Sequence, residues 1–174
     1  MIAFIMLGIL FYLFSITLIS IRFASKRRDI HELKNTDCII HGAISITGLA
    51  LVQSGGFTLA TILFVWYVVL FLFVIVETAE IIRGIARIQK YGWQKGIFTY
   101  NITQWARNFT FGMFYFFTVN LVHTFSSSRN SLSFQNHFLN LLGWIVLLLL
   151  IVEISLFLIF IVTKTKPLAI AKKI

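Results

Sequence analysis

The sequence predicts an all-α integral membrane protein with about five transmembrane helices, an external N-terminus and a cytoplasmic C-terminus. The first observation is composition: 59% of the residues are hydrophobic and 12% are charged, whereas about 25% are charged in soluble domains. The second is that the apolar runs are continuous, which favours helices because a backbone in lipid must satisfy its hydrogen bonds within its own segment. The third is that every Lys and Arg except Arg129 falls into three segments, which the positive-inside rule assigns to the cytoplasm.

The first three helices follow from two charge-free runs. Residues 2–21 carry no charge and are long enough to cross a hydrocarbon core about 30 Å thick. The basic cluster that follows them places the C-terminal end of this helix in the cytoplasm. The run from Ile39 to Val76 is also uncharged, but it is too long for one span and must turn back. The turn signal inside it is Gln53-Ser54-Gly55-Gly56. Helices are therefore expected over 38–53 and 57–79.

The helix expected over 38–53 is rich in small residues, which allow neighbouring helices to approach closely. This pattern favours an ordinary packing helix, and the alternative is a re-entrant or substrate-lining segment. The small residues are Gly42, Ala43, Ser45, Thr47, Gly48 and Ala50.

The second half of the chain completes the predicted topology. The segment over 81–106 mixes cations with isoleucine and tryptophan and is interrupted at Gly92 and Gly96, which is typical of an interfacial amphipathic stretch. Two more spans are expected over 108–125 and 138–163, separated by a polar external loop. Five spans from an external N-terminus place the lysine-rich tail inside, in agreement with its charge. The whole chain of 174 residues is thus predicted to be one helical bundle.

Glu153 departs most sharply from the apolar pattern, because it stands near the middle of the helix expected over 138–163. A charge at the bilayer centre costs about 2.5–3.5 kcal/mol on insertion scales. The carboxyl group should therefore face the bundle and be paired or protonated. Arg107 is the expected partner if the last two helices are antiparallel neighbours, and the alternative for Arg107 is an extension to lipid phosphates. Glu153 is then either a proton or cation site or a polar clamp between helices or subunits.

Two further residues complete the candidate binding or ion-pathway set of Glu153, Arg107, His41 and Glu77. His41 lies about one turn inside its helix, and Glu77 lies near the end of the helix expected over 57–79. Together the four would line a polar route in the inner half of the bilayer. Bis-histidine haem ligation is a further alternative, although none of the histidines lies deep within an expected span. The four histidines are His31, His41, His123 and His137.

No catalytic residue, metal site or cofactor is predicted. Cys38 is the sole cysteine, which excludes an intrachain disulfide and a multi-cysteine metal site. The chain carries no phosphate-binding loop, no paired catalytic carboxylates and no dinucleotide fingerprint. The net charge of +9 is explained by cytoplasmic Lys and Arg that face anionic lipid headgroups, so nucleic acid is not an expected partner.

Two function classes fit these observations. The first is a non-catalytic subunit or accessory protein of a larger membrane assembly, with other membrane subunits or further copies of the chain as partners. The alternative is a small oligomeric channel or transporter with an intramembrane Glu/Arg site, and a membrane enzyme ranks third. A bacterial plasma membrane is the expected location, because a short chain with basic loops and no signal peptide fits it; an organelle membrane is the alternative.

Overall fold

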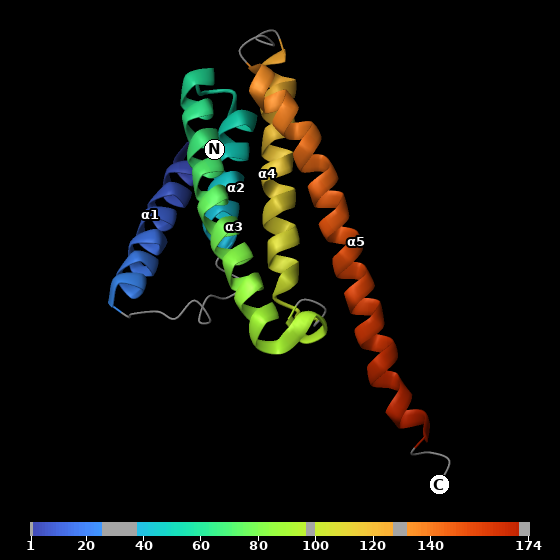
Figure 1. Ribbon diagram of the computed structural model, residues 1–174. Coiled ribbons are helices and arrows are strands. Elements are labelled where there is room, and N and C mark those ends of the chain that lie inside the picture. Colours follow the sequence, from blue (N-terminus) through green and yellow to red (C-terminus); the bar gives the residue numbers. More distant parts are fainter. Residues whose placement is uncertain (1, 26–37, 97–99, 127–131, 171–174) are drawn as a thin grey trace.

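A computed structural model describes residues 2–25, 38–96, 100–126 and 132–170, and these residues form five helices and no strand (Figure 1). The all-α prediction is therefore confirmed for this part of the chain. Successive helices run in opposite directions, so that each long axis is roughly antiparallel to the next (Figure 1). The helices are α1 (Ile2–Ser25), α2 (Ile39–Ser54), α3 (Leu59–Gly96), α4 (Gln104–Thr124) and α5 (Ser133–Ile170).

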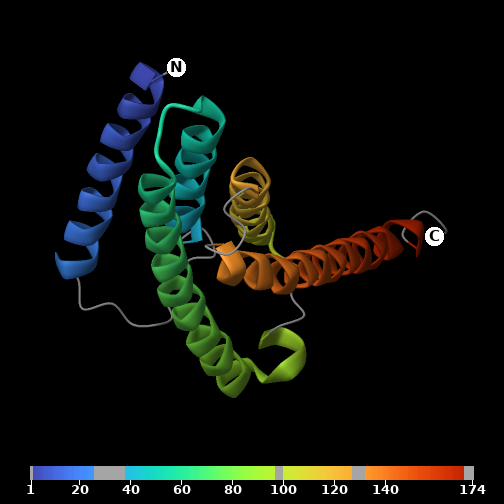
Figure 2. The ribbon, with the colours of Figure 1, turned by 90° about the horizontal axis from the view of Figure 1, so that it is seen from above.

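The centre of the molecule is a three-helix unit in which α3 and α4 both pack against α2, and large side chains such as Trp66 and Phe114 join α3 to α4. The helix α1 lies against α2 on one side, and α5 leaves the unit on the other side along α4 (Figure 2). The core between α2, α3 and α4 is filled by large aromatic and aliphatic side chains. Its fully buried members include Ile62, Trp66, Val69, Phe114, Phe117 and Leu121, and Leu142 of α5 packs against them.

Small residues let α2 approach α4 closely. A Cβ atom added at Gly42 would lie 2.3 Å from Cγ2 of Thr110, and one added at Gly48 would lie 2.5 Å from the ring of Phe117. The α4 backbone and its aromatic rings therefore occupy the space that larger α2 side chains would need. The small-residue face predicted for 38–53 serves helix packing within the chain.

The turn between α2 and α3 forms where the sequence predicts it. Helix α2 ends at Ser54, and Gly55 adopts a left-handed conformation with φ 66°. A side chain at this position would clash with the backbone, so glycine suits this helix end. The amide N–H of Gly55 donates to the carbonyl oxygen of Val52 at 3.3 Å, which satisfies one of the last carbonyl groups of α2.

Helix α3 is longer than expected, because it continues beyond residue 79 to Gly96. Gly84 keeps a helical conformation, and the backbone leaves the helical region at Gly92, with φ 75° and ψ 169°. The first half of the expected interfacial stretch is thus a continuation of α3, and the predicted interruption at Gly92 is a kink. Residues 97–99 lie outside the described part of the chain.

Two helical segments are long and apolar enough to cross a membrane: Leu59–Trp93, with 35 residues, and Ser133–Thr163, with 31 residues. Only 17% and 11% of their most apolar stretches are buried inside the molecule. A core helix of a soluble protein would bury far more of its apolar surface. These two helices therefore suggest a membrane location. The helices α1 and α2 contain shorter apolar segments, Ile5–Ile21 and Ile39–Ser54.

Candidate functional site

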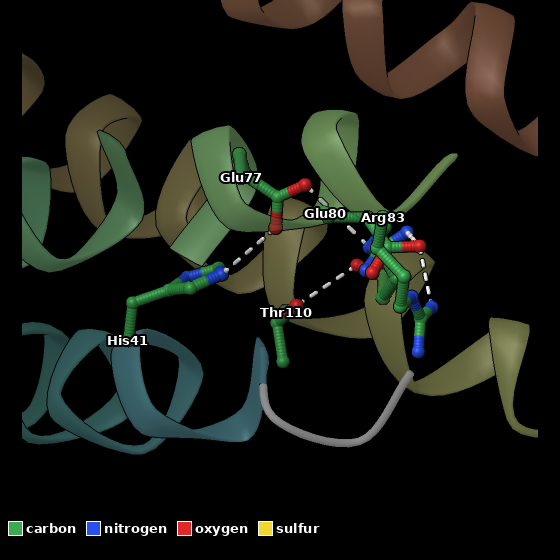
Figure 3. A network of polar contacts seen from close by, with 6 residues as sticks. His41, Glu77, Glu80, Arg83 and Thr110 are labelled. Carbon is green, nitrogen blue, oxygen red and sulfur yellow. Dashed lines mark hydrogen bonds and ion pairs between the residues drawn. The ribbon is translucent and has the colours of Figure 1, made fainter. Parts of the chain in front are cut away.

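A polar cluster of five side chains lies at the end of the bundle where α2 and α4 begin, which is the lower end in Figure 1. In Figure 3, Glu77 on α3 reaches toward His41 on α2, and Glu80 and Arg83 follow along α3. The cluster thus joins the three central helices at one level of an otherwise apolar bundle. Its members are His41, Glu77, Glu80, Arg83 and Arg107.

Arg107 links the two carboxylates of α3 to α4. Its Nη1 atom lies 3.0 Å from Oε1 of Glu80, and its Nε atom lies 3.5 Å from Oε2 of Glu77. Arg83 forms a hydrogen-bonded ion pair with the same oxygen of Glu80. The side chains of Glu77, Glu80 and Arg107 are only 17–19% exposed. Two carboxylates face two guanidinium groups, so the charges of the glutamates and arginines balance.

His41 is fully buried at the α2 side of the cluster. The rings of Phe73 and Phe111 meet it edge-on, with centroid distances of 5.2 Å and 6.2 Å. Its Nε2 atom lies 3.5 Å from Oε1 of Glu77. That distance permits electrostatic attraction, but neither atom makes a hydrogen bond with the described residues. His41 and Glu77 therefore each have a buried polar atom that could still form a hydrogen bond.

The cluster forms because the sequence spaces its members correctly. Glu77, Glu80 and Arg83 recur every three residues, which places them on one face of α3. On α4, the hydroxyl of Thr110 donates to the carbonyl oxygen of Arg107 at 2.9 Å. The methyl group of Thr110 occupies the space left by Gly42. The close contact of α2 with α4 therefore brings the first turn of α4, with Arg107, beside the first turn of α2.

The structure brings together three of the four candidate residues, His41, Glu77 and Arg107, and leaves Glu153 apart. The expected pair of Arg107 with Glu153 is wrong for the described residues, because Arg107 pairs with the two glutamates of α3 instead. The helices α4 and α5 are antiparallel neighbours as expected. Arg107 nevertheless pairs with α3, because the carboxylates of Glu77 and Glu80 lie at the same height in the bundle as Arg107.

Glu153 faces the bundle, as the cost of exposing a charge to lipid requires. It is only 5% exposed, and its Oε1 atom has no hydrogen-bond partner among the described residues. Further along α5, Phe157 and Phe160 contact the ring of Tyr100, and Phe157 also contacts Trp105. Glu153 thus lies one turn above an aromatic contact between α5 and the start of α4.

Sequence reasoning missed Glu80 and Arg83 as members of the site. Their pairing as helix neighbours is visible in the sequence, but their link to α4 through Arg107 is not. The three-residue spacing from Glu77 is the signal that would have added Glu80, because both carboxylates then share one face of α3.

The described histidines lie at opposite ends of the bundle. His41 belongs to the polar cluster, whereas His123 and His137 are exposed near the junction of α4 and α5. His31 lies outside the described residues. Cys38 is a buried thiol directly before α2. Within the described ranges, no group of three or more His, Cys, Asp and Glu side chains is placed to hold a metal ion.

A cavity of about 370 Å³ lies at the junction of α4 and α5, far from the polar cluster. Apolar residues form much of its lining, and His123, Ser126 and Asn136 add polar groups. The amide of Asn136 already donates to the carbonyl oxygen of Leu132 at 3.2 Å.

The chain matches no protein-family model, no curated protein and no solved structure.

Proposed function

We propose that the chain is a non-catalytic subunit or accessory protein of a larger membrane assembly, with five transmembrane helices, an external N-terminus and a cytoplasmic C-terminus. The distribution of charge supports this topology, because the lower end of the bundle in Figure 1 holds the polar cluster and the cationic end of α3 with Arg87 and Lys90. The upper end carries the short α2–α3 turn, which has no charged residue. A bacterial plasma membrane is the proposed location, with an organelle membrane as the alternative.

The observation that carries the proposal is the placement of α5. This helix packs against the bundle along one face, as far as the contact of Phe157 with Trp105, and its C-terminal end extends beyond the other helices (Figure 1). Large apolar side chains remain uncovered along it, including Trp144, Leu148 and Ile159, which are 74%, 62% and 60% exposed. Lipid provides no hydrophobic force that would hold such a helix in place, so packing contacts set its position. A helix of a partner subunit would supply the contacts that this chain does not.

The polar cluster also supports a structural role. Its carboxylates and guanidinium groups neutralise each other and connect α2, α3 and α4. Above it, the buried rings of Phe111, Phe114, Phe117 and Trp66 fill the centre of the bundle. In the part of the chain that the structure describes, these rings fill the middle of the bundle, which argues against a polar route through a single copy because close-packed core side chains exclude water.

A channel or transporter is the alternative, and one observation favours it. Both ring nitrogens of His41 and Oε1 of Glu77 are buried without a hydrogen-bond partner among the described residues. Unpaired buried polar groups are costly and often mark functional sites in membranes. A transport route would then run along the surface between several copies of the chain and would include Glu77 and Arg107.

Purification in mild detergent with mass determination tests the proposal. The wild-type chain is expected to co-purify with a different membrane protein in a defined ratio. Truncation of the exposed α5 face by Leu148→Ala and Ile151→Ala should weaken that complex. Phe64→Ala is the matched control, because Phe64 is an exposed apolar residue on α3 and its truncation should leave the complex intact.

A monomer that binds no other protein, or a homo-oligomer that the α5 substitutions leave intact, would contradict the subunit proposal. Ion flux in liposomes would then decide on the alternative. A flux that disappears in Glu77→Gln and persists in Phe64→Ala would establish a transport function, and an optical spectrum with a Soret band would instead point to haem.

A further inference from the structure

The polar cluster divides the cations of α3 and α4 into two groups. Arg83 and Arg107 are engaged by the carboxylates of Glu77 and Glu80. Arg87 and Lys90 follow on the same helix, and neither forms an ion pair with a carboxylate of the described residues. Both acidic residues of α3 therefore belong to the cluster. Among the described residues, no carboxylate neutralises Arg87 and Lys90 further along the helix.

Aromatic side chains accompany these two cations. Tyr91 and Trp93 are 54% and 64% exposed, and Nζ of Lys90 lies 5.4 Å from the centre of the Tyr91 ring. The kink at Gly92 turns the chain at this place. Exposed tyrosine and tryptophan beside lysine and arginine are typical of the layer between water and hydrocarbon. Lys90 and Arg87 lie about two to three helical turns beyond Glu80.

The apolar residues on the same part of α3 fit a lipid surface. Ile81, Ile82 and Ile85 are exposed, and they precede the cations along the helix. A helix that passes from exposed isoleucines to cations and aromatic rings moves from the acyl chains into the headgroup layer. A soluble acidic protein would match the charge of Arg87 and Lys90, but it would leave these isoleucines in water.

We infer that Arg87, Lys90, Tyr91 and Trp93 form a binding surface for the headgroup of an anionic phospholipid. The guanidinium of Arg87 and the ammonium of Lys90 attract the phosphate, and the two rings lie at the glycerol level. This inference names which cations contact lipid, and it excludes Arg83 and Arg107 because the cluster engages them. The inference applies whether the chain is a subunit of a membrane assembly or a transporter.

Quenching of tryptophan fluorescence by brominated lipids tests the inference on the full chain in vesicles. The vesicles contain equal amounts of phosphatidylcholine and phosphatidylglycerol, with bromine on one of the two lipids at a time. The difference between proteins with and without Trp93→Phe isolates the signal of Trp93. Brominated phosphatidylglycerol is expected to quench Trp93 several-fold more than brominated phosphatidylcholine does.

The double variant Arg87→Gln with Lys90→Gln should bring the quenching by the two lipids close to equality, because neither side chain would then attract the anionic headgroup. Gln89→Ala is the matched control, because Gln89 is an exposed neutral residue on the same turn, and it should keep the wild-type ratio. Both cations lie outside the polar cluster, so the melting temperature should not change.

Three outcomes would overturn the inference. The first is equal quenching by both lipids in the wild type, and the second is an unchanged preference in the double variant. The third is loss of the preference when inorganic phosphate is added at constant ionic strength, because the surface would then bind free phosphate and not a lipid headgroup.

Discussion

At the scale of residues, the main feature is that Arg107 holds two helices together through two carboxylates. Guanidinium groups present several donors in a fixed plane, which suits contact with Glu77 and Glu80 at once. Removing one member of a buried ion pair leaves the other members without compensation. The cluster is therefore expected to be sensitive to single substitutions although its total charge is balanced.

Replacing Arg107 by Gln should destabilise the fold by about 3 kcal/mol, because the carboxylates of Glu77 and Glu80 would lose their link to α4. Thermal denaturation of the purified chain in detergent measures the change. Arg87→Gln is the control, since Arg87 has no carboxylate partner among the described residues. Equal melting temperatures for the two variants would show that the Arg107 pairs contribute no stability.

At the scale of elements, α2 and α4 form the tightest contact of the bundle. Thr110 on α4 lies against Gly42, and Phe117 lies against Gly48. Trp66 of α3 joins this contact, because its indole N–H donates to the hydroxyl of Thr118 at 3.0 Å. Close packing of this kind replaces the hydrophobic driving force that is absent between helices in lipid.

Gly42→Ala should destabilise the chain by about 1–3 kcal/mol, because the new methyl group would overlap Thr110 and push α4 away from α2. The Cα atom of Thr110 would lie 3.4 Å from the added Cβ, so rotation of the threonine side chain alone does not relieve the contact. Gly112→Ala is the control, since no atom lies within 4 Å of its added Cβ. A melting temperature for Gly42→Ala at or above that of Gly112→Ala would contradict the tight α2–α4 contact.

The two buried glutamates on α3 and α5 should respond differently to removal of their charge. Glu77→Leu should destabilise the isolated chain, because Arg107 would lose a carboxylate partner. Glu153→Leu should leave its stability equal or raise it, because its carboxyl group has a buried oxygen without a partner among the described residues. Thermal melts of both variants give the comparison. A large loss of stability in Glu153→Leu would mean that Glu153 has an ionic partner in the folded chain.

Glu153→Gln separates the two function classes. If α5 docks onto another subunit, this variant should change only the strength of the assembly, as mass determination of the purified complex would show. If Glu153 belongs to an ion route, its replacement should abolish ion-dependent activity in liposomes while the assembly stays intact.

At the scale of the whole molecule, the chain consists of a packed three-helix unit with one helix on each side of it (Figure 2). The polar cluster lies at one end of this unit, and the small cavity lies at the other. The ends therefore differ in chemistry, which is expected if they face different compartments.

Fusion reporters test the proposed orientation in a bacterial membrane. Alkaline phosphatase, which is active only outside the cytoplasm, should be active when inserted after Ser126 and inactive when fused to the C-terminus. Green fluorescent protein at the C-terminus should be fluorescent. The opposite pattern would reverse the topology, and activity at both sites would contradict the proposed number of spans.

The sequence alone determined the helical class, the turn after α2 and the kink at Gly92. These follow from local properties: apolar runs set helices, and glycine supplies backbone conformations that other residues avoid. The same reasoning selected His41, Glu77 and Arg107 as candidate site residues. Each is a charged or titratable residue in apolar surroundings, where burying such a group costs free energy.

Only the tertiary structure decided which of these residues meet. Glu153 and Arg107 are on neighbouring helices and have opposite charges, yet Arg107 pairs with Glu77 and Glu80 on α3. The choice depends on the rotation of each helix about its own axis and on how closely α4 approaches α2 at Gly42. Helix rotation is set by the packing of many side chains at once, so the spacing of charges along the sequence does not determine it.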